Sequence, residues 1–211
     1  MGESRLSVLP SKLIEMVEFL KFSNLQLSQK SRDGRINSAF NEDEIFDLLE
    51  KNFDTIRPKA RDWVDFSFVD NEIFYPVNIK VSTTKTADNL NCKLGIYYAL
   101  TGKIPPFGNG VSWENYFKLL SENIKSNDRD YYFLIINKEN YQDIFVTSLK
   151  GLQVIVANGN NLPFQAKWDD NRIHEKRSYK ASKEFLLSTF KESLKLRADA
   201  YFSYEKYFGR K

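Results

Sequence analysis

The sequence has very little cysteine and histidine, the side chains on which many catalytic and metal sites are built. Among 211 residues there is one cysteine, Cys92, and one histidine, His174. A single cysteine excludes an internal disulfide and is typical of a reducing compartment, and a single histidine leaves no histidine-based triad or zinc cluster. Cys92 continues an apolar helical pattern and is expected to pack, whereas His174 lies in a polar stretch and is expected at the surface.

Long apolar runs and glycine-rich phosphate loops are also missing. No apolar run reaches the ~18 residues that a membrane span needs, and no signal-peptide pattern is present. Neither GxxxxGK[ST] nor GxGxxG occurs. We therefore expect a soluble, cytoplasmic protein with no membrane partner.

Neither basic nor acidic residues are in large excess. The chain has 31 basic and 28 acidic residues, a net charge of +3. This balance permits an anionic partner without requiring one, so a local basic patch matters more than the total. Hydrophobic residues are plentiful at 42%, which indicates a folded chain. With no repeats, low-complexity tracts or linkers, we expect one domain over residues 1–211.

The hydrophobic periodicity predicts an α/β (α+β) fold, in which helices flank a mixed central β-sheet that carries a hairpin. Asn41 followed by Glu44 resembles a capping box, and Ser112 is in the position of a helix N-cap. Apolar spacing predicts helices over 11–22, 41–53, 89–102, 112–126 and 184–207. It predicts strands over 63–69, 73–82, 131–137, 143–149 and 153–157.

The two strands of the hairpin carry polar residues that a strand built only for packing would not need. Strict alternation places Val64 and Phe66 on one face and Asp65 on the other. Asn78 and Lys80 share a face of the second strand in the same way. A two-residue turn at positions 71 and 72 would set Asp65 opposite Asn78, and a turn at 70 and 71 would preserve the face. The three polar side chains are therefore expected to converge, at the Cβ separation of roughly 4.5–5.5 Å typical of cross-strand pairs.

This combination suits metal-assisted hydrolysis of a phosphodiester. Mg²⁺ prefers hard oxygen ligands, which the carboxylate of Asp65 and the backbone carbonyl of Ile79 could supply. Lys80 would place an ammonium group beside the attacking water and the scissile phosphate, where negative charge develops.

The same residues carry a resemblance to a known family. Val64-Asp65, a spacer of twelve residues and then Asn78-Ile79-Lys80, on a hairpin that follows an acidic helix, resemble the PD-(D/E)XK nuclease superfamily. The order and size resemble its type II restriction endonucleases, and the likeness covers roughly residues 33 to 102 well. It implies a restriction-endonuclease-like fold and a Mg²⁺-dependent, sequence-specific cleavage of double-stranded DNA. It also implies a homodimer and a companion DNA methyltransferase.

Asn78 departs from the motif, which usually has an acid at that position. An amide offers an oxygen but no charge, so another acid is expected to compensate. Glu44 is the expected compensator because it flanks the apolar stripe of its helix near Leu48. The expected catalytic residues are therefore Asp65, Asn78, Lys80 and Glu44. The expected metal ligands are Asp65, Ile79, Asn78 and Glu44.

Basic and polar residues outside the hairpin are candidates for DNA contacts. The expected set is Arg35, Asn37, Lys85, Arg172, Lys176, Arg177 and Lys180. The loops over residues 103–110 and 158–168 are rich in side chains that can bond base edges, and could read the sequence.

Other interpretations of these residues stay open. Asp65 and Lys80 could form an ordinary cross-strand ion pair, and Glu44 could simply cap its helix. Within the superfamily, a DNA repair or transposon-associated nuclease would carry the same motif. A DNA-binding module with a decayed nuclease site would explain Asn78, although decay rarely spares both Asp65 and Lys80.

Overall fold

The computed structural model describes residues 6–23, 25, 27, 34–59, 62–108 and 110–209, with the backbone only for residues 34–39. The helices are α1 Ser11–Phe22, α2 Gly34–Glu50, α3 Lys93–Thr101, α4 Trp113–Asn123 and α5 Tyr179–Phe208, with a short 3₁₀ helix at Trp168–Asn171. The strands are β1 Phe66–Asp70, β2 Ile73–Ser82, β3 Ala87–Leu90, β4 Tyr132–Asn137, β5 Ile144–Ser148, β6 Val156–Ala157 and β7 Phe164–Lys167.

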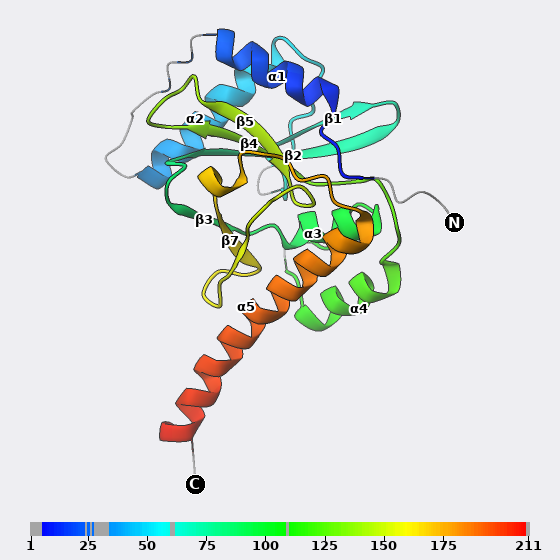
Figure 1. Ribbon diagram of the computed structural model, residues 1–211, viewed down its shortest axis with the longest axis vertical. Coiled ribbons are helices and arrows are strands. Elements are labelled where there is room, and N and C mark those ends of the chain that lie inside the picture. Colours follow the sequence, from blue (N-terminus) through cyan, green and yellow to red (C-terminus); the bar gives the residue numbers. More distant parts are fainter. Residues whose placement is uncertain are drawn as a thin grey trace.

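A four-stranded mixed sheet forms the centre, in the order β1-β2-β4-β5. β2 pairs with β1 in the antiparallel direction and with β4 in the parallel direction, and β5 is antiparallel to β4. A parallel pair needs a long crossover, which here includes α3 and α4. Figure 1 shows α1 and α2 on one side of this sheet and α3, α4 and α5 on the other. The expected mixed α/β architecture is confirmed.

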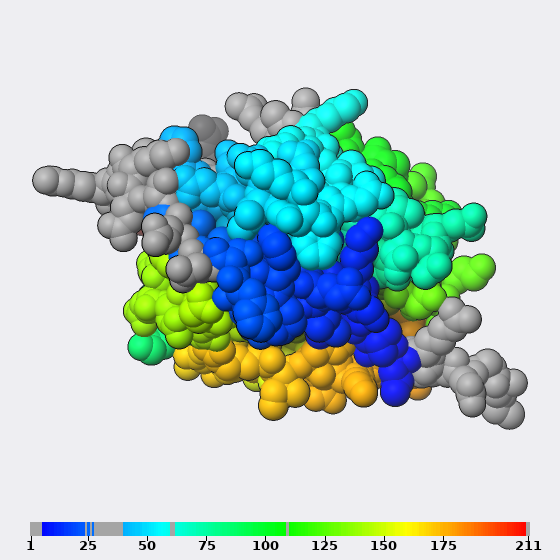
Figure 2. Space-filling model, turned by 90° about the horizontal axis from the view of Figure 1, so that it is seen from above, coloured from blue at the N-terminus to red at the C-terminus, as the bar shows by residue number. Residues whose placement is uncertain are grey.

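Two hydrophobic clusters cover the two faces of the central sheet. Phe66 and Phe68 of β1 pack with α1 and α2. Figure 2 shows this layer from outside, with α1 in blue beside the chain that follows α2, which is cyan. Phe133 and Ile135 of β4 belong to the other cluster, with residues of α3, α4 and α5. Every residue of β4 is buried, because both of its faces are covered.

The turn of the hairpin sets the register on which the site depends. Asn71 and Glu72 have positive φ angles of 47° and 64°, the conformation of a tight two-residue hairpin turn. Asp70 pairs with Ile73 across it, as the turn at positions 71 and 72 requires. β1 begins only at Phe66, and Val64 packs in the cluster on the opposite face from Phe66. The expected alternation is therefore wrong at Val64, because the chain leaves the strand at Asp65.

The second helix begins earlier than expected. α2 extends from Gly34 to Glu50, so Asn41 lies inside the helix and is buried. A residue with intrahelical neighbours on both sides cannot be an N-cap, and the capping box from Asn41 to Glu44 is therefore wrong. Ser112 does cap α4, since its Oγ accepts a hydrogen bond from Asn115 N.

A second sheet of three short strands, in the order β3-β7-β6, was not expected. β3 is antiparallel to β7, with Asn89 paired to Gln165 and Leu90 to Phe164. Trp168 Nε1 donates a hydrogen bond of 2.6 Å to Asp88 and fixes the edge of this sheet to the 3₁₀ helix. The strands have two to four residues, too short for a periodic pattern to show in the sequence.

A buried polar cluster joins the N-terminal segment to the end of β5. Ser148 Oγ donates to Asp130 Oδ2 at 2.6 Å and lies 3.0 Å from His174 Nε2, which is also 3.2 Å from Ser7 Oγ. His174 is thus partly buried rather than at the surface, and burial lowers its pKa. Each of the two serines contacts both Asp130 and His174, so the histidine does not stand between a serine and the acid as in a catalytic triad.

None of the helices in the described part of the chain combines the length and the apolar character that crossing a membrane would require.

Two valines of the hairpin give a matched test of the fold. Val77 is completely buried, whereas Val69 is 47% exposed. We expect Val77→Ala to lower the free energy of unfolding by roughly 1.5–3 kcal/mol, because it removes buried methyl groups and leaves a cavity. Val69→Ala should change it by less than about 0.5 kcal/mol. Urea denaturation of both variants measures the difference, and equal losses would contradict the described orientation of the hairpin.

Candidate active site

Asp65 lies at the first position before β1 and faces β2. Its Oδ2 accepts hydrogen bonds from Asn78 Nδ2 at 2.5 Å and from Ile79 N at 2.6 Å. Its own N–H donates to Val77 O at 3.0 Å, which extends the pairing of the hairpin by one residue. The expected convergence of Asp65 with Asn78 is therefore present in the structure.

The hairpin residues open into a cleft of about 220 Å³. Asp65, Asn78 and Lys80 all line it, so the three polar positions share one cavity. Its other lining residues are the polar Asp62, Asn89 and Asn91 and the apolar or aromatic Trp63, Leu90, Cys92, Tyr131 and Phe133. Tyr131 also donates from its hydroxyl to Trp63 O at 2.9 Å, which ties the segment before Asp65 to β4.

Burial governs the protonation of Asp65. Removal from water raises the pKa of its carboxyl group, because the charged form loses solvation. The hydrogen bond from Ile79 N, the charge of Lys80 and the hydrogen bond from Asn78 act in the opposite direction. Hydrogen bonds from Asn78 and Ile79 of the hairpin thus stabilise the carboxylate of Asp65.

Glu42 of α2 is the acid that the sequence interpretation missed. Burial first, and then the negative charge of Asp65, raise the pKa of Glu42 from 4.5 to about 7. Lys80 acts in the opposite direction on the same carboxyl group. Glu42 is therefore within electrostatic range of both ends of the hairpin site.

Helix geometry shows why Glu42 rather than Glu44 is in this position. Glu42 precedes Ile45, Phe46 and Leu49 by three, four and seven residues, and those three side chains are buried under α2. Residues two apart on a helix point about 200° away from each other, so Glu44 cannot share the direction of Glu42. The expected convergence of Glu44 with Asp65 stays a prediction, and Glu42 is a second acid of the same helix to be considered. The sequence did contain a signal for this position, because Glu42 is a charged residue on the stripe of α2 that is otherwise apolar and buried.

The backbone of Ile79 offers a further oxygen. Lys138 N, at the end of β4, donates to Ser82 O, so the even-numbered residues of β2 point their backbone groups towards β4. Ile79 points its groups to the β1 side, where its N–H meets Asp65 instead of a strand. Its carbonyl oxygen points to the same side as its N–H, and its role as a metal ligand stays a prediction.

These groups fit a hard divalent cation. Asp65, whose negative charge raises the pKa of Glu42, and the backbone carbonyl of Ile79 match the oxygen ligands of Mg²⁺, which needs only one or two carboxylates. In the described ranges no group of three or more His, Cys, Asp or Glu side chains could hold a metal ion. A Mg²⁺ ion at Asp65 would therefore need water and phosphate oxygens to complete its ligands.

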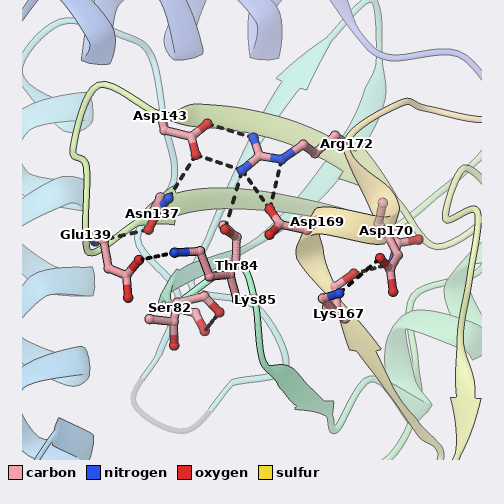
Figure 3. A network of polar contacts seen from close by, with 12 residues as sticks. Ser82, Thr84, Lys85, Asn137, Glu139, Asp143, Lys167, Asp169, Asp170 and Arg172 are labelled. Carbon is pink, nitrogen blue, oxygen red and sulfur yellow. Dashed lines mark hydrogen bonds and ion pairs between the residues drawn. The ribbon is translucent and has the colours of Figure 1, made fainter.

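Arg172, expected to contact DNA, is neutralised within the protein. Figure 3 shows its guanidinium held by Asp143 and Asp169, with hydrogen bonds of 2.8 to 3.0 Å. These partners, Asp143 foremost, raise the pKa of Arg172. In this structure the ion pair joins the segment after β7 to the residue before β5, and the expected contact of Arg172 with DNA stays a prediction.

Arg177 is engaged in a similar way. Its guanidinium donates to the carbonyl oxygens of Lys150, Leu152 and Gln153 and stacks 4.1 Å from the ring centre of Phe185. Burial of the group lowers its pKa. It therefore holds a loop rather than presenting a charge.

The remaining basic candidates are distributed over the surface. Lys85 forms an exposed ion pair with Glu139 at 3.1 Å. Lys176 and Lys180 are exposed, before and within the first turn of α5. The side chains of Arg35 and Asn37, in the first turns of α2, lie outside the described residues.

Comparison with known proteins does not assign the chain to a family. No protein family model matches the chain, and no curated protein is significantly similar to it.

Stability at two pH values tests the position of Glu42. The pKa of Glu42 in the folded chain, about 7, lies above the ordinary value of 4.5. Between these two pH values the folded state therefore keeps a proton that the unfolded state has released. The wild type therefore loses stability as the pH rises through this range. Glu42→Gln should remove this loss and gain on the order of 1–3 kcal/mol relative to the wild type between pH 4.5 and pH 8.

Glu44→Gln is the matched control, from the same helix and with the same change of charge. Denaturant unfolding of the three proteins at both pH values measures the effect. A larger pH-dependent gain for Glu44→Gln than for Glu42→Gln would show that the wrong glutamate has been assigned.

Asn78→Asp tests the shared cation site. The new carboxylate replaces a donor to Asp65 with a negative charge. We expect a lower melting temperature than wild type in EDTA and a larger rise on addition of Mg²⁺, because a cation relieves the repulsion. Thermal melting with and without Mg²⁺ measures both. An equal Mg²⁺-dependent rise in variant and wild type would place the metal elsewhere.

Proposed function

We propose that the protein is a Mg²⁺-dependent, sequence-specific endonuclease for double-stranded DNA, of the type II restriction kind, on a restriction-endonuclease-like fold. The observation that carries the proposal is the convergence of Asp65, Asn78 and Lys80 in one cleft, with Glu42 in electrostatic range. Structural ion pairs also bring acids and lysines together, but they do not need two partly buried acids with raised pKa values beside an open cleft.

Asp65, Glu42 and the carbonyl of Ile79 would hold the metal. Mg²⁺, when bound, supplies Lewis-acid polarisation of the phosphate and neutralises charge on its oxygens. Asn78 keeps Asp65 in place by donating to Oδ2, so its role is to position the ligand rather than to supply the missing charge. Glu42 supplies that charge.

Lys80 acts on the reacting groups from the adjacent position of β2. Its ammonium faces the same cleft as Asp65 and lowers the pKa of both nearby acids. A positive charge there orients the attacking water and stabilises the negative charge that develops on the phosphate.

Two symmetric sites are needed to cut both strands of a palindromic duplex, so the proposal includes a twofold homodimer. The end of α5 supports this arrangement. It projects from the body in Figure 1. Several of its aromatic side chains are exposed, which is a common feature of interfaces. These are Tyr201, Phe202, Tyr204, Tyr207 and Phe208. A cytoplasmic location and a companion methyltransferase belong to the same proposal.

Incubation with plasmid DNA tests the function. The wild type should produce discrete fragments with Mg²⁺ and none with EDTA. Asp65→Asn and Lys80→Met should lower the cleavage rate by about 10²-fold or more while DNA binding is retained, because they remove transition-state stabilisation rather than the docking surface.

Asp70→Asn is the control, since Asp70 lies on the same hairpin at the turn, away from the cleft. A wild type that shifts DNA in a gel without cutting it would identify a binding module instead. A smear would identify a non-specific nuclease, and cutting by Asp65→Asn at the rate of Asp70→Asn would refute the site.

A further inference from the structure

The outer face of the small sheet carries a row of amides beside the cleft. Leu90 and Phe164 pair across β3 and β7 and belong to the core, so the neighbouring pair, Asn89 and Gln165, points to the other face. Val156 of β6 is aligned with Gln165 on that face and is exposed. The face is thus polar, with one apolar residue at its edge.

Asn158, just after β6, uses its whole side-chain amide in four hydrogen bonds. Its Oδ1 accepts from the backbone N–H groups of Asn160 and Asn161 at 3.0 and 3.1 Å. Its Nδ2 donates to Asn89 Oδ1 at 2.9 Å and to Gln165 Oε1 at 3.0 Å. No bonding capacity of this side chain is left for a ligand.

These bonds determine which way the other two amides point. A backbone N–H can only donate, so the oxygen of Asn158 must face Asn160 and Asn161, and its amino group must face Asn89 and Gln165. Asn89 and Gln165 therefore turn their oxygens towards Asn158 and their amino groups away from it. Within the described chain neither of these amino groups donates to a protein acceptor. Two hydrogen-bond donors with a fixed orientation are presented on the outer face.

The loop that carries Asn158 is rigidly attached to α5. Asn158 N donates to Ser193 Oγ at 3.0 Å, and the Arg197 guanidinium donates to Gly159 O and Asn160 O at 2.8 and 2.7 Å. A Cβ on Gly159 would lie 2.9 Å from Arg197 N, so the loop packs directly on the helix. Little ordering would be left to occur when a ligand binds.

The amide face is continuous with the proposed catalytic cleft. Asn89 belongs to both, since it lines the cleft with Asp65 and Lys80 while its oxygen accepts from Asn158. Asn89 therefore borders the place that the proposed function gives to the phosphate, and Gln165 is its partner on the neighbouring strand, away from the cleft.

We propose that Asn89 and Gln165, oriented by Asn158, form a sequence-reading site for the acceptor edge of guanine in the major groove. Guanine presents two acceptors there, N7 and O6, whereas cytosine presents an amino donor and adenine a donor beside an acceptor. The inference rests on the proposed function, because it takes double-stranded DNA as the ligand. Asn158 is a positioning residue and does not touch the base.

Asn158→Asp tests this inference by reversing the pattern at constant shape. Oδ1 of the aspartate still accepts from the two backbone N–H groups, but its second oxygen repels the oxygens of Asn89 and Gln165. Both amides should rotate and present oxygens outward, which suit the amino group of cytosine. In a selection of bound duplexes from a randomised library, with Asp65→Asn in every protein to prevent cutting, the preference for guanine over cytosine at the contacted position should fall by about tenfold or more.

Asn160→Asp is the control, because it adds the same charge in the same loop but does not alter the bonds of Asn158. It should weaken binding without changing the selected sequence. Asn89→Asp is an independent second variant that replaces one outward amino group with oxygen at an exposed residue, and it should shift the preference in the same direction. Melting curves establish that each variant is folded.

The outcomes separate this inference from the proposed function. A reference protein that selects a guanine-containing site, with a shift in Asn158→Asp and Asn89→Asp but not in Asn160→Asp, supports the inference. Unchanged selection in folded Asn158→Asp, or in Asn89→Asp if the first variant does not fold, overturns it and leaves the endonuclease intact. A reference protein that binds no duplex DNA overturns both.

Discussion

The hydrogen bond from Ile79 N to Asp65 Oδ2 is the interaction on which the site depends. β1 begins only at Phe66, so the N–H of Ile79 faces the β1 side of the sheet at a point that the strand does not reach. A buried N–H without a partner is costly, and the carboxylate of Asp65 satisfies it in place of another strand residue. The carbonyl of Ile79 points to the same side of β2 as its N–H. The interrupted strand therefore provides the two oxygen atoms that the proposed function assigns to the metal.

Electrostatics then determines what this arrangement suits. Asp65 and Glu42 both have raised pKa values, burial is the main cause of both shifts, and the charge of Lys80 lowers both. Without a cation, the site resists having both carboxylates charged near neutral pH. A divalent cation removes that conflict, and Lys80 then remains available for the substrate. The amide at position 78 is compatible with this chemistry because the second charge comes from α2.

The sequence predicted the hairpin well because its signal is local. Alternation over ten residues and the tight turn specify the face of each side chain, so the meeting of Asp65 with Asn78 was predictable. Glu42 was missed because Glu44, which flanks the apolar stripe near Leu48, was expected to be the compensating acid. Glu42 precedes the buried Ile45 and Leu49 by three and seven residues, so it lies on the same stripe of α2.

Long-range partners could not be predicted in this way. The second sheet joins residues 87–90 to residues 164–167, and neither segment is long enough to show a period of its own. A basic residue such as Arg172 also looks the same in sequence whether it meets DNA or a carboxylate of the protein. Only the fold brings Asp143 of the β4–β5 connection to its guanidinium.

The location of the cation is the central claim, and anomalous diffraction from crystals grown with Mn²⁺ in place of Mg²⁺ tests it most directly. The account predicts a peak at about 2.1 Å, or slightly more, from an oxygen of Asp65 and from the carbonyl oxygen of Ile79, with the carboxylate of Glu42 bound directly or through water. A peak held by Glu44, or by acids outside the cleft with Asp65 unliganded, would contradict it.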